Sequence, residues 1–403
     1  MPSAVIVGAG VAGLAVAGAL ARADWQVTLL EHAERLRADN AALLIWPNGR
    51  RALGDLGLSG GLDAIAAPVP VAGIRRPDGT WLVRPEDMDA TATPPLVVQR
   101  EDLHDTLFAG LGDRVDLRTG VGVRSVRLAA GQAAAVGDGE STWEADLVVG
   151  ADGVDSVVRR RLAPEATMIS SGCTAWRAVI PWYQATDLLD LIERQATAGP
   201  SGETVGAGHR FRYAVMGSRG SAGASSRGGI YWAATVPGAA RPESAPAQLT
   251  LLHRWFADWH APIGDLIAAT DPDRLIQHPI GELWPMPRAF AYHAGAGGYA
   301  LTGDAAHAMA HHRGDGACLA LEDAAALVAA VSRVEPGPAL TRALTSYSQE
   351  RRGQVVRIGR QSRRIGAVLV SSRASSRTRD AVLGLAPGPL GRASSALRHL
   401  GRS

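Results

Sequence analysis

The sequence contains no lysine, so all 41 of its basic residues are arginine, against 39 acidic residues. A chain without lysine has no side-chain amine for a Schiff base or for a lysine general base. The near balance of charge gives no general reason to expect a nucleic-acid partner. We therefore exclude lysine-based covalent catalysis and predict no nucleic acid among the partners.

Cysteine and long apolar runs are scarce as well. Cys173 and Cys318 are too few for a disulfide framework, and reduced thiols are the default in a cytoplasmic protein. The chain enters an apolar strand soon after Met1, without the basic region, apolar core and cleavage site of a secretory signal. No run approaches the length of a membrane span. We expect a cytoplasmic protein with no membrane span, and we predict no metal site.

The first thirty residues carry a glycine motif between two predicted strands. Residues 4–7 form an apolar strand, which is followed by the G-x-G-x-x-G sequence Gly8-Ala9-Gly10-Val11-Ala12-Gly13 and a helix to Ala23. A second strand, 26–30, ends in Glu31. This order is typical of a dinucleotide site, in which the glycines allow a tight turn and close approach to a pyrophosphate. The acid can accept hydrogen bonds from a ribose.

Two later segments repeat the pattern of a buried strand that ends in a Gly/Asp turn. Residues 147–150 lead into Asp152-Gly153, and residues 298–302 lead into Gly303-Asp304. A glycine-punctuated loop and an apolar helix over 317–330 follow the second turn. A carboxylate at a strand end beside a helix start suits a ligand with both hydroxyls and anionic groups.

The middle and the end of the chain differ in character from these segments. Strands rich in Trp, Tyr and Arg are predicted from about residue 172, including 174–180 and 229–235. A long helix is predicted from 338 to about 370, ahead of a basic tail that ends at Ser403. We interpret the arginines of this helix as a solvated face packed along the domain boundary, in preference to a membrane or nucleic-acid surface. They are Arg351, Arg352, Arg357, Arg360, Arg363 and Arg364.

The three motif segments together resemble the fingerprints of single-component FAD-dependent monooxygenases. This is the p-hydroxybenzoate hydroxylase class, and the chain is most similar to its salicylate hydroxylase and zeaxanthin epoxidase-like branch. The resemblance extends to about Arg364 and includes the middle segments 172–177 and 259–263. It implies FAD, NADH or NADPH as a transient co-substrate, and dioxygen. It also implies hydroxylation of an aromatic substrate, polycyclic and secondary-metabolite compounds included, through a flavin hydroperoxide.

The resemblance implies an α/β fold: a Rossmann-type FAD-binding domain with an interleaved β-sheet substrate domain and a long C-terminal helix. The predicted boundaries are 1–171 with 285–335 for the FAD-binding domain, 172–284 for the substrate domain and 336–403 for the C-terminal segment. A monomer or homodimer is expected.

The same resemblance assigns residues to the FAD site. Arg100 would reach the phosphate and ribityl region, the backbone of Val123 would contact adenine, and Asp304 would hold the ribityl chain. Backbone N–H groups at the start of the helix would lie beside the flavin pyrimidine, where reduced flavin carries negative charge. The implied cofactor contacts are Gly8, Gly10, Val11, Ala12, Gly13, Glu31, Arg100, Val123, Asp152, Asp304, Gly314, Gly316, Ala317 and Cys318.

The loop before that helix departs from the family pattern. His311 stands in place of a proline, Asp315 in place of glutamine and Cys318 in place of asparagine. His311 and His312 are candidates for proton transfer or for a covalent link to the flavin, and a solvated loop is the alternative. A flavin-binding accessory protein with impaired reduction, an epoxidase and a decarboxylating hydroxylase stay open as alternative functions.

The substrate is expected between the flavin and the strands of residues 172–284. His209, Arg212 and Tyr213 are candidates for orienting or deprotonating it, and Arg177, Tyr231 and Trp232 are candidates for contacting it. Because side chains alternate along a strand, only about half of such a set can face a pocket.

Overall fold

The protein is described from a computed structural model. The structure describes residues 1–36, 39, 41–70, 72–87, 93–127, 131–194, 199–216, 228–293, 297–310 and 314–369. The predicted site residues His311 and His312 and the basic tail lie outside the described residues.

A six-stranded sheet forms one half of the molecule, in the order β18-β19-β12-β1-β2-β8. Its strands are β1 (Ser3–Val7), β2 (Gln26–Leu30), β8 (Val115–Arg118), β12 (Leu147–Gly150), β18 (Ala291–His293) and β19 (Gly298–Leu301). All neighbours pair in parallel except β18, which is antiparallel to β19. The central strands are almost entirely apolar because both faces of the sheet are covered. We call this the parallel sheet.

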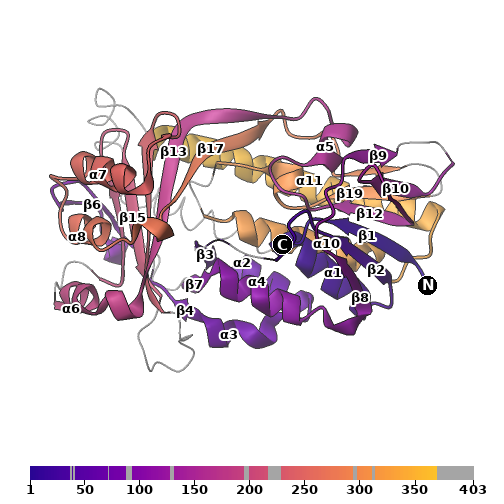
Figure 1. The fold of residues 1–403 in the computed structure, drawn as a ribbon, viewed down its shortest axis with the longest axis horizontal. Coiled ribbons are helices and arrows are strands. Elements are labelled where there is room, and N and C mark those ends of the chain that lie inside the picture. Colours follow the sequence, from indigo (N-terminus) through magenta and orange to yellow (C-terminus); the bar gives the residue numbers. More distant parts are fainter. Residues whose placement is uncertain are drawn as a thin grey trace.

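Helices cover one face of the parallel sheet and a small β-layer covers the other (Figure 1). The helical side holds α1 (Val11–Arg22), α4 (Arg100–Ala109) and α10 (Gly316–Val331), with α2 (Pro47–Asp55) and α3 (Leu62–Ile65) beside them. The other side holds α5 (Val157–Leu162) and the antiparallel strands β9 (Ser125–Arg127), β10 (Ala134–Gly137) and β11 (Thr142–Ala145). The parallel strands therefore end, at their carboxyl ends, at an edge facing the second half of the molecule.

The second half is built on a seven-stranded sheet in the order β17-β13-β16-β15-β14-β5-β6. Its strands are β5 (Ile74–Arg75), β6 (Trp81–Val83), β13 (Thr167–Pro181), β14 (Ser201–Val205), β15 (Arg210–Val215), β16 (Gly229–Pro237) and β17 (Ile276–Trp284). The helices α6 (Thr186–Arg194), α7 (Ala245–Trp255) and α8 (Ile263–Ala268) pack on its outer face (Figure 1). The arrangement of the two sheets confirms the predicted fold class.

Residues from the N-terminal part of the chain complete the seven-stranded sheet. The predicted turn over residues 75–80 joins β5 to β6, and β5 pairs in parallel with β14. These strands precede residue 172, so the seven-stranded sheet is not confined to one continuous segment. The boundaries given for the two domains stay a prediction.

A small sheet and a long helix connect the two halves. The small sheet has the order β3-β7-β4, from β3 (Ala42–Ile45), β7 (Leu96–Gln99) and β4 (Ala66–Pro68). Its Ala42 and Val97 form one apolar cluster with Val179 and Tyr231 of the seven-stranded sheet. Helix α11 (Pro338–Leu369) packs on α10, β18 and β19 and extends to β17, where Arg363 Nε donates to Glu282 Oε2 at 2.9 Å.

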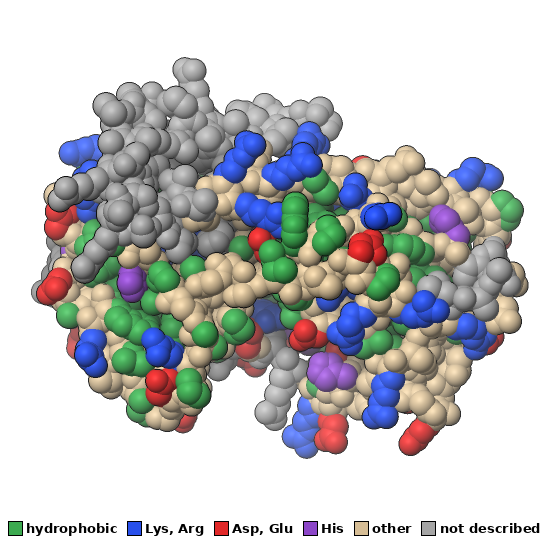
Figure 2. Space-filling view, turned by 90° about the horizontal axis from the view of Figure 1, so that it is seen from above, with side chains coloured by type: hydrophobic (Ala, Val, Ile, Leu, Met, Phe, Trp, Pro, Cys, Tyr) green, Lys and Arg blue, Asp and Glu red, His purple; other side chains and the backbone are tan. Residues whose placement is uncertain are grey.

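The charge on the surface is mixed in sign. Figure 2 shows basic and acidic side chains interspersed on the face seen from above. On α11, Arg357, Arg360 and Arg364 are exposed, as the prediction of a solvated face requires, but Arg351 is buried. That prediction is therefore wrong for Arg351, whose role belongs to the site described below.

We expect the substitution Gly202→Ala to destabilise the seven-stranded sheet. Gly202 lies directly opposite Tyr213, and a Cβ at this position would be 2.2 Å from the tyrosine ring. Overpacking of this kind costs about 1–3 kcal/mol, to be measured as the free energy of unfolding in urea. Gly264→Ala is the control, since a Cβ there meets nothing within 4 Å in α8. Equal stability of both variants would contradict the expectation.

Candidate functional site

The glycine loop between β1 and α1 has the geometry of an anion site. Gly8 has φ +99°, and a Cβ on Gly13 would lie 1.8 Å from the Gly8 carbonyl oxygen, so the fold itself requires both glycines. A Cβ on Gly10 would meet nothing within 4 Å. Gly10 is the N-cap of α1 and makes no side-chain cap, which leaves the first N–H groups of that helix for an anionic ligand.

Two buried side chains from distant segments hold this loop. Glu31 Oε2 accepts a hydrogen bond from the Ala9 N–H at 2.8 Å, and its Oε1 accepts from the Ala33 N–H at 2.9 Å. The predicted acid thus lies at the end of β2 against the glycine loop. The His104 ring on α4 also contacts the loop, with Nε2 2.9 Å from the Ala9 carbonyl oxygen. Nothing in the sequence around His104 signals this contact.

The Gly303-Asp304 turn lies against the same loop. Gly303 has φ +58°, and a Cβ there would lie 3.2 Å from Ala12 Cβ and 3.3 Å from Ala320 Cβ. The turn therefore fits between the start of α1 and α10. Asp304 is exposed although the three residues on either side of it are buried. Its carboxylate is thus available to a ligand that lies along the glycine loop.

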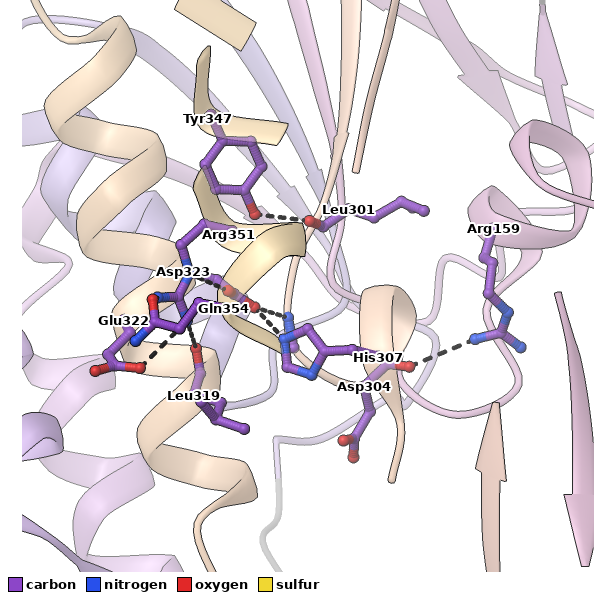
Figure 3. Close-up of polar contacts among 11 residues, drawn as sticks. Arg159, Leu301, Asp304, His307, Leu319, Glu322, Asp323, Tyr347, Arg351 and Gln354 are labelled. Atoms are coloured by element: carbon purple, nitrogen blue, oxygen red, sulfur yellow. Dashed lines mark hydrogen bonds and ion pairs between the residues drawn. The ribbon is translucent and has the colours of Figure 1, made fainter. Parts of the chain in front are cut away.

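The buried carboxylate of Asp323 holds the Gly303-Asp304 turn in place (Figure 3). Asp323 Oδ2 accepts from the Gly303 N–H at 2.9 Å and hydrogen-bonds to His307 Nε2, while its Oδ1 accepts from Arg351 Nε at 2.7 Å. Arg351 also contacts Glu322 Oε2 at 3.3 Å. In Figure 3 the Asp304 side chain points away from this cluster. The Asp323 cluster joins the turn to α10 and α11, and the sequence analysis missed it because its members lie far apart in the chain.

The charges of this cluster determine its protonation. Burial alone lowers the pKa of His307, but the Asp323 carboxylate outweighs burial and raises that pKa above its ordinary value. Burial alone raises the pKa of Asp323, but His307 and Arg351 outweigh it and hold that pKa below its usual range. The surroundings therefore favour the protonated form of His307 and the ionised form of Asp323.

The Asp152-Gly153 turn stabilises the start of α5. The Asp152 carboxylate accepts hydrogen bonds from the Ser156 hydroxyl, from the Val157 N–H at 2.8 Å and from the Val158 N–H at 3.2 Å, all at the start of α5. Burial raises its pKa. Its predicted cofactor contact stays a prediction. The buried Arg159 donates to the carbonyl oxygens of Gly153 and Ala305, both at 3.4 Å, and so joins this turn to the segment after Asp304.

The start of α10 lies beside the small sheet. The Cys318 thiol is close to the Leu44 carbonyl oxygen at 3.4 Å and accepts from the Trp46 N–H at 3.3 Å. Burial raises the pKa of this thiol to about 12, which disfavours the reactive thiolate form of Cys318. Gly314, with φ +73°, precedes the helix, and a Cβ on it would be 3.6 Å from a guanidinium nitrogen of Arg212. Gly316 and Ala317 form the first turn of α10.

Two predicted cofactor residues lie nearer the surface. Arg100 Nη1 pairs with Asp39 Oδ2 at 2.7 Å, and both side chains are about two-fifths exposed. Val123 lies at a shallow surface cavity of ≈ 600 Å³ that Arg124, Arg160 and Arg161 also line. Their predicted contacts with FAD stay predictions.

Strand register divides the predicted substrate residues between two faces of the seven-stranded sheet. Arg177 on β13 and Arg212 on β15 both lie opposite Ala233 of β16, so the three share one face. Tyr231 lies two residues from Ala233 on that same face. Tyr231 and Ala233 pack in the apolar cluster with the small sheet, so this face is turned towards the cofactor half.

The predictions for His209, Tyr213 and Trp232 need correction. Trp232 Nε1 donates to Thr270 Oγ1 at 2.9 Å, within the core beneath α7 and α8, and Tyr213 packs in that same core. The His209 ring contacts Phe256 at a centroid distance of 5.9 Å on this outer side. These residues alternate with the inward set, so they cannot line the face towards the parallel sheet.

Comparison with known proteins supports the identity of this site. A family profile described as "FAD binding domain" matches residues 2–362. The 3-amino-4-hydroxybenzoate 2-monooxygenase of Streptomyces platensis is 30% identical, over 91% of this chain and 88% of that protein. The 2-heptyl-3-hydroxy-4(1H)-quinolone synthase of Pseudomonas aeruginosa is 32% identical, over 90% of this chain and 88% of that protein.

A solved structure shares the fold. The crystal structure of Klebsiella pneumoniae HpxO with FAD and uric acid aligns with a TM-score of 0.78 and 23% identity, over 96% of this chain and 93% of that chain. The chain therefore belongs to the FAD-binding-domain family, within its FAD-dependent monooxygenases. The predictions of family, cofactor and enzyme class are confirmed.

Neither a membrane-crossing helix nor a metal centre is found in the described part of the chain. None of its helices is long and apolar enough to cross a membrane. Among the same residues, no group of three or more His, Cys, Asp or Glu side chains is placed to hold a metal ion.

We expect the stability of the protein to fall above about pH 6.5 because of His307. Its pKa is higher in the folded than in the unfolded protein, where it is about 6.5. The stabilising contribution is therefore complete below that pH and is lost as the pH rises through the raised pKa. Urea unfolding across this pH range should show the fall, and the substitution His307→Gln should reduce its slope.

The control is His253→Gln, which changes an exposed histidine of α7. This variant should keep the slope of the unmodified protein. A slope in the His307 variant equal to that of the control would contradict the assignment of the charge to His307.

Proposed function

We propose that this protein is an FAD-dependent monooxygenase that hydroxylates an aromatic substrate, with NADH or NADPH as the reductant and dioxygen as the oxygen source. The observation that carries the proposal is the convergence of three segments from distant parts of the chain. The glycine loop, the Gly303-Asp304 turn and the start of α10 lie against one another, within contact of Ala12 and Ala320.

The residues at this junction fit FAD. The open space at Gly10 and the uncapped start of α1 suit a pyrophosphate. Glu31, at the end of β2, would accept hydrogen bonds from the adenosine ribose, and the exposed Asp304 would hold the ribityl hydroxyls. Bound FAD would supply the redox chemistry: a hydride from the nicotinamide would reduce it, one oxygen atom of dioxygen would go to the substrate and the other would leave as water.

The protein contributes binding, orientation and electrostatics. The Asp323 cluster keeps the Gly303 backbone in its left-handed conformation, which sets the position of Asp304. The N–H groups at the start of α10 carry partial positive charge, which would stabilise the negative charge of a reduced cofactor bound beside them. The small sheet and the seven-stranded sheet bring Tyr231, Val179 and Leu44 together in one apolar cluster.

Support for an aromatic substrate comes from the relatives. The names of two of them specify a hydroxybenzoate and a quinolone, both aromatic rings. An epoxidase and a decarboxylating hydroxylase are alternatives because they are related flavin enzymes on the same fold. The alternative of an accessory flavoprotein rests on the loop from His311 to Cys318, part of which lies outside the described residues. These alternatives, a cytoplasmic location and a monomeric or homodimeric state stay predictions.

The substitution Asp304→Ala should weaken FAD binding by about tenfold to a hundredfold, because hydrogen bonds to a charged group are lost. Flavin fluorescence during reconstitution of the apoprotein measures the Kd. Asp265→Ala is the matched control, since Asp265 is an exposed aspartate on α8 of the outer layer. An unchanged Kd in the Asp304 variant would count against this site.

Enzymatic activity needs a separate measurement. Anaerobic mixing of the holoenzyme with NADH or NADPH should bleach the flavin absorbance, and isotope-labelled dioxygen should appear in a hydroxylated aromatic product. A flavoprotein that neither reductant bleaches, even with aromatic compounds present, would contradict the proposed function.

A further inference from the structure

We propose that Ser362 of α11 is a positioning residue for the bound flavin. Its hydroxyl holds the carboxyl-terminal end of the segment 303–310, and the Asp323 cluster holds the amino-terminal end. The inference rests on the proposed function, because this segment carries Asp304, the residue proposed for the ribityl hydroxyls. It goes further by giving α11, which lies outside the cofactor motifs, a part in fixing that residue.

One face of α11 is buried along the second half of the helix. Arg351, Val355, Gly359 and Ser362 are all buried, and they follow one another at intervals of four, four and three residues. Such intervals place residues on one face of a helix. At 1.5 Å per residue, Arg351 and Ser362 are about 16.5 Å apart along the axis. The two polar members of this face therefore contact the cofactor half at two separate points.

Arg351 reaches the amino-terminal end of the segment through one intermediate side chain. Its Nε donates to Asp323 Oδ1 at 2.7 Å, and Asp323 Oδ2 accepts from the Gly303 N–H at 2.9 Å. In Figure 3 the Asp304 side chain points away from these two residues. The start of the segment is thus tied to α11, and the Asp304 carboxylate stays open to a ligand.

Ser362 reaches the other end directly. Its Oγ donates to the Ala310 carbonyl oxygen at 2.9 Å, and the two residues are 2% and 4% exposed. A serine within a helix commonly bonds to the carbonyl four residues earlier in its own helix or points to solvent. Here the hydroxyl donates to a residue 52 positions earlier in the chain. Because a buried carbonyl without a donor costs free energy, this bond stabilises the position of the Ala310 backbone.

The end of the segment also touches the seven-stranded sheet. The Leu283 N–H of β17 donates to the Ala308 carbonyl oxygen at 2.8 Å. Ala310 packs in one buried apolar cluster with Cys173 of β13 and Ile280 of β17. Ser362 therefore acts where the cofactor half meets the strands of the second half.

Helix α11 is fixed to β17 right beside Ser362. Arg363 Nε donates to Glu282 Oε2 at 2.9 Å, and the Arg363 guanidinium carbon lies 3.7 Å from the centroid of the Trp284 ring. A guanidinium that both pairs with a carboxylate and stacks on an aromatic ring has a defined place. The hydroxyl of the preceding residue is thus a donor in a fixed position.

The contact to the middle of the segment is longer than those at its two ends. Arg159 Nη1 donates to the Ala305 carbonyl oxygen at 3.4 Å. Without the bond from Ser362, the backbone that carries Asp304 would have to be ordered when FAD binds. That ordering lowers the affinity for the cofactor.

The effect of Ser362 is one of position and not of charge. Ser362 and Ala310 are uncharged, so a substitution of the serine leaves the charged groups around the segment as they are. These groups are Arg159, Asp304, His307, Asp315, Glu322, Asp323 and Arg351. A change in FAD binding on loss of the hydroxyl therefore reports a change in geometry.

Reconstitution of the apoprotein with FAD tests the assignment. Ser362→Ala should raise the Kd about twofold to tenfold, because one buried hydrogen bond is lost. Ser362→Cys keeps the side-chain volume with a weaker donor, so its Kd should fall between. In the Asp304→Ala background, Ser362→Ala should have little further effect, since the serine acts through that residue.

Thr174→Val is the matched control. The Thr174 hydroxyl is also buried and also donates to a distant carbonyl oxygen, that of Gly238 at 2.8 Å. Thr174 shares the outer face of the seven-stranded sheet with Trp176, away from the cofactor half. This variant and Ser362→Ala should both lower the urea midpoint, but the Kd for FAD should rise only in the latter.

Three results would overturn the proposal. They are an unchanged Kd in Ser362→Ala, an equal rise in Thr174→Val, and a full effect of Ser362→Ala in the Asp304→Ala background. If Ser362→Ala does not fold, Ser362→Cys serves for the same three comparisons.

The outcomes separate this inference from the proposed function. A Kd that depends on Ser362 through Asp304, in a holoenzyme that neither NADH nor NADPH bleaches, would support the positioning role and contradict the monooxygenase. A hydroxylated product from a protein whose Kd for FAD does not depend on Ser362 would do the reverse.

Discussion

The carboxylate of Asp323 is the interaction on which the site depends. It lies on α10, receives a hydrogen bond from the Gly303 backbone and is flanked by His307 and Arg351. A carboxylate buried without these partners would be costly. The hydrogen bonds of Asp323 therefore tie the strand, the turn and two helices into one unit.

The parallel sheet and the seven-stranded sheet contribute differently to the site around the Asp323 cluster. The parallel sheet brings the ends of β1, β12 and β19 to one edge, where the glycine loop and the two Gly/Asp turns meet. The inward face of the seven-stranded sheet lies across from this edge, with the small sheet between them (Figure 1). Chemistry that needs a bound cofactor on one side and a variable substrate on the other fits this division, because each side can change without disturbing the other.

Local motifs explain what could be predicted from the sequence. The glycine loop, Glu31 and the Gly303-Asp304 turn each lie within a short segment whose spacing has a physical reason, and the structure places them together. Strand register is different, because a shift of one residue exchanges the two faces of a strand. The sequence around Arg212 therefore could not show that Arg212 faces inward while Tyr213 and His209 face the outer helices.

Contacts between distant parts of the chain could not be predicted from the sequence for another reason. Asp323 and Arg351 are 28 positions apart, and each by itself reads as an ordinary charged residue of a helix. The entry of β5 and β6 into the seven-stranded sheet likewise depends on a pairing with β14 that lies more than a hundred residues away. Such partners are selected by the packed structure, and a single sequence carries no local pattern for them.

The glycine loop also separates two kinds of evolutionary constraint. Gly8 and Gly13 would be retained even in a descendant that had lost its cofactor, because a side chain at either position collides with the backbone of the protein itself. Gly10 has no such collision, and its φ of −74° is open to any residue. Selection on Gly10 can act only through whatever occupies the space beside it. Among homologues, the identity of this one residue would therefore report whether a lineage still uses its nucleotide, independently of whether it still folds.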